Sequence, residues 1–370
     1  MAPLPALPAA LLPGGIRARH VEGVNGLRMH VLEAGRAGDP VLLLLHGFPE
    51  LAYSWRKVMP ALAEAGYHVI APDQRGYGRT TGWDGAYDGD VGSFRLLNLV
   101  RDVMGLLARL GVARVAGVVG HDFGASVAAW AALTRPDIFP RLVLMSAPFT
   151  GAPRLAETRT TQEADIHAAL AALARPRKHY QWYYSGRSAD ADMLGAPGGL
   201  HAFLRGYYHH KSADWPGNRP HALAGWNAEA LADMPTYYIM DLAASMPESV
   251  VMPDAATIAA CTWLSEAELG VYAGEFARTG FQGALNWYRC RTGAISLGDL
   301  EVFAGRQIEV PAAFIAGAQD WGIHQVPGAL ERMREEACAR MGPPVLVEGA
   351  GHWVQQERPG EVVAGVLGVV

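Results

Sequence analysis

The hydrophobic pattern of the first 148 residues alternates between two kinds of segment. Short, continuously apolar runs are typical of strands covered by helices on both faces, and they occupy residues 40–45, 68–71, 115–120 and 141–148. Segments with apolar residues at helical spacing lie between them, at residues 55–65, 96–110 and 125–133. Polar and apolar residues alternate over 26–32, which predicts an outer antiparallel strand.

Strands that alternate with helices predict a mostly parallel sheet with helices on both faces. The alternation breaks near residue 149, where the chain becomes helical, aromatic and rich in loops, and the buried strands resume at 310–317 and 344–349. We therefore predict an α/β core formed by residues 16–148 and 308–370, with a helical cap inserted at 149–307. Residues 1–15, which contain four prolines, are predicted to be a flexible arm rather than a secretory signal.

The sharpest local signal is the turn Gly120-His121-Asp122-Phe123-Gly124, between a predicted strand and a predicted helix. Glycine suits a strained turn in which side chains would collide, and the residue at the tip projects its side chain outwards. The turn resembles the nucleophile elbow of α/β-hydrolases, where serine usually occupies the tip. Here the tip is Asp122. Ser126 is a weak serine alternative, because it falls inside the predicted helix.

Composition narrows the class of protein. The 370 residues carry a formal net charge of −5 without a basic stripe, which argues against a nucleic-acid partner. No apolar run is long enough to span a membrane. Three cysteines, Cys261, Cys290 and Cys338, show no metal-binding spacing and are expected to be free thiols in a reducing compartment. These features predict a cytoplasmic enzyme or binding protein.

Candidate chemical groups follow several of the predicted core strands. Ligands of open α/β sheets bind at the carboxyl ends of the strands, so Asp122, Asp320, His352 and the Phe48 peptide are expected to meet there. Their order along the chain, nucleophile, then acid, then histidine, is that of α/β-hydrolases. Asp320 is favoured as the acid because none follows the preceding core strand at residues 146–148.

The motifs resemble those of the epoxide hydrolase family, and the match covers nearly the whole chain after the arm. Besides the elbow, they are His46-Gly47-Phe48-Pro49-Glu50, Tyr53-Ser54-Trp55-Arg56, Asp73-Gln74-Arg75-Gly76-Tyr77-Gly78, Gly351-His352-Trp353 and Gln356-Glu357-Arg358-Pro359. The resemblance implies an α/β-hydrolase fold and hydrolysis of an epoxide to a diol through an ester on Asp122, with no metal and no cofactor.

The resemblance also implies a role for each site residue. His352 would activate water, Asp320 would orient His352, and the backbone N–H groups of Phe48 and Phe123 would hold the oxyanion. Cap tyrosines would protonate the departing epoxide oxygen. We assign these roles to Tyr180 and Tyr288, and the first position stays open to Tyr183 or Tyr184. Substrate contacts are assigned to Trp182, Tyr184 and Trp353, and the substrates expected are water and a small apolar epoxide.

Two other functions would fit the same fold, and one cluster of basic residues lies outside the proposed site. A haloacid or haloalkane dehalogenase would use the same Asp122, Asp320 and His352, but these enzymes usually place tryptophan or arginine where this chain has Phe123. A binding protein on the same fold would be expected to lack a triad member. The cluster His209-His210-Lys211 has no matching carboxylate for a metal and is expected at the surface.

Overall fold

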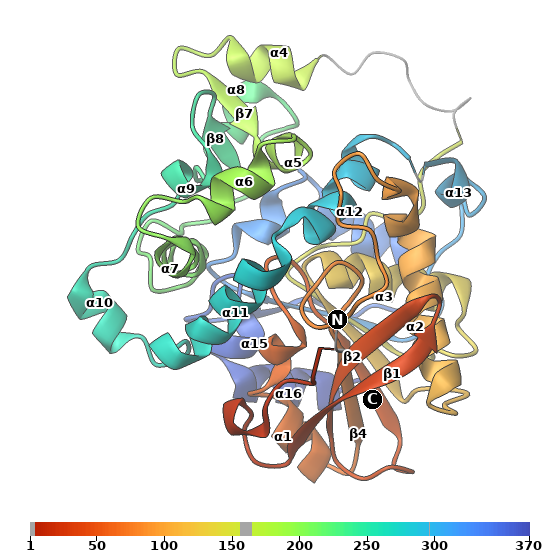
Figure 1. The fold of residues 1–370 in the computed structure, drawn as a ribbon. Helices are drawn as coiled ribbons and strands as arrows, with labels where there is room; N and C mark the ends of the chain where they lie inside the picture. The colour runs from red at the N-terminus through yellow and green to blue at the C-terminus, as the bar shows by residue number, and fades with distance from the viewer. Residues whose placement is uncertain (1–3, 156–164, 296) are drawn as a thin grey trace.

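The computed structural model describes residues 4–155, 165–295 and 297–370, with an eight-stranded sheet through the core (Figure 1). Its strands are β1 (Ile16–Val24), β2 (Leu27–Ala34), β3 (Val41–Leu45), β4 (His68–Pro72), β5 (Gly117–His121), β6 (Leu142–Met145), β9 (Ala312–Gly317) and β10 (Val345–Val347). Their order in space is β1-β2-β4-β3-β5-β6-β9-β10. β2 is antiparallel to both of its neighbours, and all other neighbouring pairs are parallel. This is the α/β-hydrolase architecture predicted from the sequence.

Alternate residues of the central strands face opposite layers of helices. In β3, Leu43 and Leu45 belong to the apolar cluster that includes α2 (Leu96–Arg109) and α3 (Phe123–Thr134). Leu42 and Leu44 belong to a second cluster, which includes α1 (Met59–Glu64) and α16 (Pro359–Leu367). Both faces of the sheet are therefore buried, which is why β3 is apolar at every position.

Two predicted elements differ from the observed ones. The strand predicted as outermost is β2, but β1 lies outside it and forms the edge of the sheet. Only three of the nine residues of β1 are buried, so its hydrophobic pattern is weak. The helix predicted over 55–65 is replaced by a short 3-10 helix, η2 (Ala52–Trp55), and by α1. Pro60 lies in the first turn of α1, where proline is tolerated because the missing N–H would have no helical partner.

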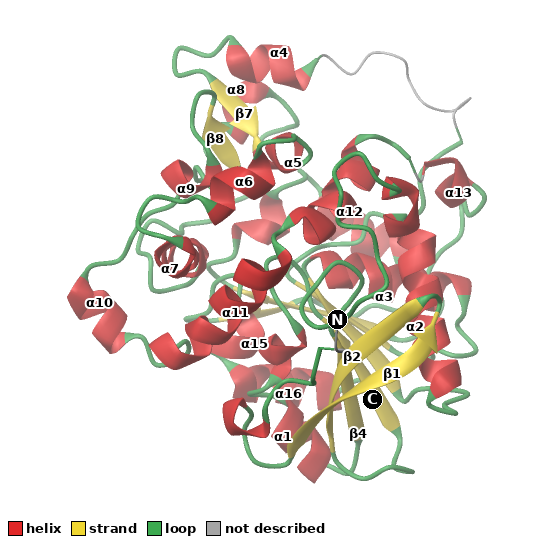
Figure 2. Cartoon of the chain, viewed as in Figure 1, coloured by secondary structure: helices red, strands yellow, loops and turns green. Residues whose placement is uncertain are grey.

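Between β6 and β9 the chain leaves the sheet and forms a layer of short helices beyond the ends of the parallel strands (Figure 2). A hairpin of β7 (Arg177–His179) and β8 (Ile239–Asp241) lies among these helices. The helices are α4 (Ile166–Ala171), α5 (Tyr180–Tyr184), α6 (Ala189–Leu194), α7 (Leu200–Lys211), α8 (Ala228–Leu231), α9 (Met246–Ser249), α10 (Ala255–Ala260), α11 (Glu266–Thr279), α12 (Gln282–Thr292) and α13 (Leu297–Glu301).

Buried polar bonds fasten this layer to the core. The Tyr208 hydroxyl in α7 donates to the Pro49 carbonyl at 3.0 Å. The Arg56 guanidinium, only 1% exposed as a residue, donates to Glu268 in α11 at 2.8 Å. These bonds join the two layers directly above the ends of the parallel strands, where ligands of such sheets bind.

The N-terminal arm is anchored rather than free over its described part. Arg28 donates to the Leu4 carbonyl at 2.8 Å, Arg79 donates to the Pro5 carbonyl at 2.9 Å, and the Leu7 N–H donates to His30 at 3.2 Å. Leu7 is 7% exposed and joins the main apolar cluster. The prediction of a flexible arm overlooked this single apolar anchor. Across the described parts of the chain, no helix has the length and apolar character needed to cross a membrane.

Candidate active site

Asp122 stands at the tip of the turn between β5 and α3. Its backbone adopts φ 51° and ψ −120°, an unusual conformation for a residue with a side chain. The turn is so tight that a Cβ on Gly120 would lie 2.3 Å from the Gly124 carbonyl oxygen, and one on Gly124 would lie 2.3 Å from the Leu45 oxygen. Both glycines are therefore required by close packing, and the strained tip directs the Asp122 carboxylate into a cavity.

The three residues of the predicted triad come together. His352 Nε2 lies 3.5 Å from Asp122 Oδ2 and has no hydrogen-bond partner among the described residues. His352 Nδ1 lies 3.1 Å from Asp320 Oδ1 on the other side of the ring. Asp320 also accepts a bond from the Gly322 N–H at 2.7 Å, which fixes its carboxylate. An imidazole held in this way by a carboxylate presents its free nitrogen for proton transfer.

The Asp122 carboxylate stays ionised despite its burial. Burial alone would raise its pKa, but the adjacent His352, with the charges of Lys211 and His121, holds that pKa well below its ordinary value. The Phe48 N–H donates to Asp122 Oδ1 at 2.9 Å. The two carboxylate oxygens are therefore distinct: Oδ1 is bound by a backbone donor, whereas Oδ2 faces His352.

A buried polar network supports the backbone of His352. His121 bonds through Nδ1 to Glu50 at 2.6 Å and through Nε2 to the His352 carbonyl at 2.7 Å. Glu50 also accepts bonds from Gln355 at 2.8 Å and Gln356 at 3.1 Å. The Glu50 and His121 side chains are inaccessible to solvent, so they act behind the site rather than inside the cavity.

Of the four candidate cap tyrosines, two line the cavity and two do not. Tyr180 and Tyr288 both line the cavity that contains Asp122, and their ring centres lie 6.0 Å apart. Tyr183 instead donates to Asp192 at 2.8 Å, and Tyr184 donates to Tyr207 at 3.2 Å. Burial, followed by the charge of Asp122, raises the pKa of both cavity tyrosines, so each keeps its proton at neutral pH.

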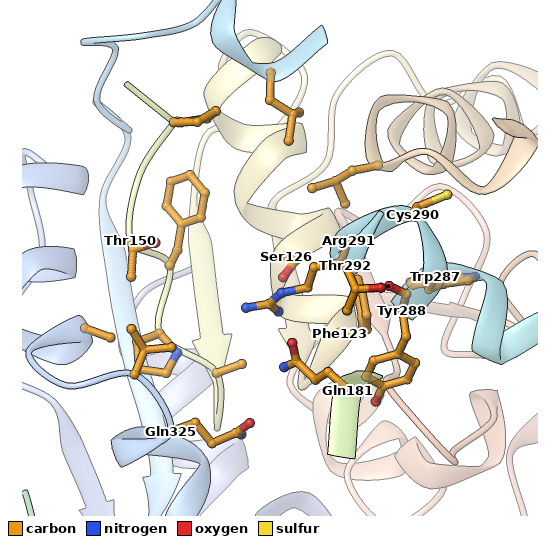
Figure 3. A pocket seen from close by; sticks show the side chains of 18 of the residues that line it. Phe123, Ser126, Thr150, Gln181, Trp287, Tyr288, Cys290, Arg291, Thr292 and Gln325 are labelled. Atoms are coloured by element: carbon orange, nitrogen blue, oxygen red, sulfur yellow. Dashed lines mark hydrogen bonds between the residues drawn. The ribbon is translucent and has the colours of Figure 1, made fainter. Parts of the chain in front are cut away.

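The cavity has a volume of about 820 Å³ and a mixed wall (Figure 3). Trp182, predicted to contact substrate, lies in its lining, whereas Tyr184 and Trp353 do not. Both of these residues are fully buried behind it, and the Trp353 indole donates to the Tyr208 carbonyl at 2.8 Å. Polar side chains contribute to the lining as well as aromatic ones, among them Ser126, Thr150, Gln181 and Gln325.

The cluster His209-His210-Lys211 is buried, contrary to the expectation that it lies at the surface. The Lys211 ammonium sits among aromatic rings, with their centres between 4.7 and 5.6 Å away: Tyr207, Tyr237, Tyr238 and Trp353. Burial lowers its pKa to about 8, against the charges of Asp122 and Asp320, which raise it. The burial of Lys211 could not be predicted, because no local sequence pattern distinguishes a lysine in an aromatic cage from a solvated one.

The loop of His352 is tied to the cap by one carboxylate. Glu357 accepts bonds from the backbone N–H groups of Gly351 at 2.9 Å, Trp353 at 3.0 Å and Ala213 at 2.8 Å. The first two flank His352, and Ala213 follows α7 of the cap. Burial raises the pKa of Glu357 to about 7, although the three backbone bonds lower it.

Comparisons with known proteins identify the family and the fold. A family described as alpha/beta hydrolase fold matches residues 40–169. Epoxide hydrolase A of Mycobacterium tuberculosis is 37% identical to this chain over 358 residues, which cover 95% of this chain and 97% of that protein. The structure of epoxide hydrolase I of potato, Solanum tuberosum, superposes with a TM-score of 0.74 at 32% identity, covering 95% of this chain and 98% of that one. Epoxide Hydrolase A of Mycobacterium thermoresistibile gives 0.74 at 35% identity, covering 96% and 99%.

Proposed function

The chain belongs to the epoxide hydrolase family of α/β-hydrolases, and we propose that it opens an epoxide to a vicinal diol through a covalent ester on Asp122. The observation that carries this proposal is the shared cavity. It brings an ionised carboxylate at an elbow tip together with two protonated tyrosines, and the unpartnered nitrogen of His352 lies behind that carboxylate.

In the first step, Asp122 Oδ2 attacks a ring carbon of the epoxide. A bond forms between this oxygen and the carbon, the carbon–oxygen bond of the ring breaks, and its electron pair passes to the departing oxygen. Tyr180 and Tyr288 donate hydrogen bonds to that oxygen, and one of them supplies the proton that makes it a hydroxyl. A carboxylate suits this attack because it needs no prior deprotonation.

In the second step, water attacks the ester. His352 Nε2 takes a proton from the water, and the resulting hydroxide adds to the carbonyl carbon of the Asp122 ester. The oxyanion is held by the N–H groups of Phe48 and Phe123, of which the Phe48 group already contacts Asp122 Oδ1. Asp320 stabilises the protonated imidazole. Collapse releases the diol oxygen, which takes the proton from His352. The second proton of the water, left on the Asp122 carboxyl group, returns to the tyrosinate formed in the first step, so the carboxylate and both tyrosines are restored.

The tyrosine pair favours an epoxide over a halide as the leaving group. An epoxide oxygen leaves as an alkoxide and needs a proton, whereas a halide needs only hydrogen-bond donors. Tyr180 and Tyr288 are buried donors that retain their protons, and Phe123 offers no donor through its side chain. Water and an epoxide with an apolar body are thus the proposed substrates, since aromatic side chains form much of the wall. The free cysteines support the cytoplasm as the proposed compartment.

A single turnover in heavy-oxygen water tests the covalent step. The purified protein, in excess over an aryl epoxide, is quenched and digested, and the peptide that contains Asp122 is weighed beside the diol. We expect the label first in the Asp122 carboxylate, because the water oxygen adds to the carbonyl carbon of the ester and stays on the enzyme when the diol oxygen leaves. Label found only in the diol would mean that water attacks the epoxide directly, and the ester mechanism would be wrong.

A further inference from the structure

The cavity lining carries charges of both signs. Asp122 supplies a negative charge at the proposed reaction site. The lining also contains three arginines, Arg154, Arg291 and Arg332, and one further acid, Glu336. This excess of positive charge contrasts with the chain as a whole, whose formal net charge is −5. A negative group on a substrate would be repelled by Asp122 and attracted to an arginine of the lining.

Of the three lining arginines, Arg291 is the nearest in sequence to a residue of the proposed chemistry. It lies in the last turn of α12, three residues after Tyr288, and residues three apart share one face of a helix with Cβ atoms about 5–6 Å apart. Figure 3 shows both residues on the same helix at the wall of the cavity. A group bound by Arg291 would therefore lie close to an epoxide oxygen that Tyr288 protonates.

The guanidinium of Arg291 is available for a ligand. Within the described ranges of the chain it forms no ion pair and no side-chain hydrogen bond, and the residue is exposed. Arg289, two positions earlier in α12, is fully engaged by contrast. It donates to the Tyr87 carbonyl at 2.6 Å and to Asn286 at 3.0 Å, and it stacks on the Tyr87 ring at 3.8 Å. The helix thus uses one arginine to fix the cap and leaves the other facing the cavity.

The charge of Arg291 already acts on the site. Burial, and then the charge of Asp122, raise the pKa of Tyr180, whereas Arg291 lowers it. After burial, Arg291 is also the largest cause of the lowered pKa of His179, another residue of the cavity wall. These effects agree with the place of Arg291 in the cavity lining (Figure 3).

We infer that Arg291 binds a carboxylate of the substrate, so that the preferred substrate is an epoxide that also carries an acid group. The inference rests on the proposed function, because it places the acid in the cavity where the epoxide is opened. A guanidinium binds a carboxylate through two parallel N–H donors, which fixes orientation as well as adding affinity. Repulsion from Asp122 and attraction to Arg291 together place the epoxide, rather than the acid, beside the nucleophile.

A matched pair of substrates tests the inference. An aryl epoxide with a carboxylic acid on its ring is compared with the corresponding primary amide, which has nearly the same shape and no charge. We expect the wild-type protein to favour the acid in kcat/KM. Arg291→Gln should lower the acid-to-amide ratio about tenfold, mainly through KM, which corresponds to roughly 1.4 kcal/mol. Arg291→Lys should retain an intermediate ratio, because it keeps the charge and loses the paired donors.

Arg334→Gln is the control variant, since Arg334 is exposed in the segment Met333–Ala337 and does not line the cavity. It removes the same charge and should leave the ratio unchanged. An identical ratio in the wild type and Arg291→Gln overturns the inference, and so does an equal fall in the control. Diol formation from the amide keeps the proposed function intact in either case. If the wild type converts neither compound to a diol, the proposed function itself fails.

Discussion

The Tyr180 hydroxyl donates a hydrogen bond to Gln325 Oε1 at 2.8 Å, which joins the cap helix α5 to the core loop that carries Asp320. Gln181 Nε2 donates to the same hydroxyl at 3.1 Å. The proton of Tyr180 is therefore already bound by an acceptor. The Tyr288 hydroxyl forms no hydrogen bond with any residue that the structure describes, although its residue is 3% exposed. The two proposed donors are thus unequal before substrate binds.

This inequality predicts that Tyr288→Phe slows ring opening more than Tyr180→Phe does. A general acid typically contributes about 10²- to 10⁴-fold to the rate, and the donor that need not leave a partner should contribute more of it. Rapid-quench measurement of ester formation gives the rate of ring opening. The decay of the preformed ester gives the rate of ester hydrolysis. Equal slowing of both steps by Tyr288→Phe would contradict its role as the acid.

Asp122→Ala is expected to abolish turnover and leave the fold intact. The carboxylate is the proposed nucleophile, while its backbone strain arises from the turn and remains in the variant. Ser126→Ala is the matched control, because Ser126 lines the same cavity from inside α3 and should not supply the nucleophile. Diol release and circular dichroism are measured for both. Wild-type activity in Asp122→Ala, or its complete loss in Ser126→Ala, would falsify the assignment.

His352→Gln should stop the reaction after the ester has formed. The variant keeps Asp122, Tyr180 and Tyr288 but loses the base that activates water, so the alkylated protein should accumulate. Intact-protein mass spectrometry after mixing with an epoxide should show one added substrate mass on each chain. Asp122→Ala/His352→Gln is the control and should show no addition. If His352→Gln stays unmodified, His352 is needed for ester formation as well, and its proposed role as a base in the second step alone is wrong.

Lys211 predicts a distinct pH dependence of stability. Burial lowers its pKa to about 8 in the folded protein, whereas an unfolded lysine keeps its proton to about pH 10.4. Between these values the unfolded state binds more protons, so the contribution of Lys211 to the free energy of unfolding rises with pH. Below pH 8 both states are protonated, and the full cost of burying the charge is present.

Lys211→Met should therefore stabilise the protein relative to the wild type at pH 7 more than at pH 10. The expected change in that difference is about 2–3 kcal/mol, from roughly 2 pK units at 1.36 kcal/mol each. Urea unfolding of both proteins at the two pH values measures this difference in the free energy of unfolding. The contributions of other groups that titrate in this range are common to the two proteins and cancel in the difference. A difference that does not change with pH would show that Lys211 keeps its proton throughout.

Local patterns were sufficient to predict most of the sheet and the arrangement of the triad. The β5–α3 turn is specified by Gly120, Asp122 and Gly124 within five residues, and Asp320 and His352 directly follow core strands in the chain. Because the carboxyl ends of parallel strands meet at one edge, their proximity follows from their positions in the sequence.

The residues that sequence analysis missed depend on contacts between distant segments. Lys211 is caged by rings from α7, the β8 region and the His352 loop, and none of those contacts leaves a periodic signal. Leu7 anchors the arm with one side chain, which is too little to alter a hydropathy pattern. The choice of Tyr180 over Tyr183 and Tyr184 as the cavity residue required the direction of each side chain, which a five-residue helix does not fix in advance.

The position of Glu357 couples the cap to the loop of the proposed base. One carboxylate holds the segment that leaves the cap at Ala213 and the residues on both sides of His352. Moving the cap exit away from the core would remove one of these three bonds and leave the histidine loop with a different set of restraints. Glu357 is thus a mechanical link, through which a displacement of the cap would reach the imidazole.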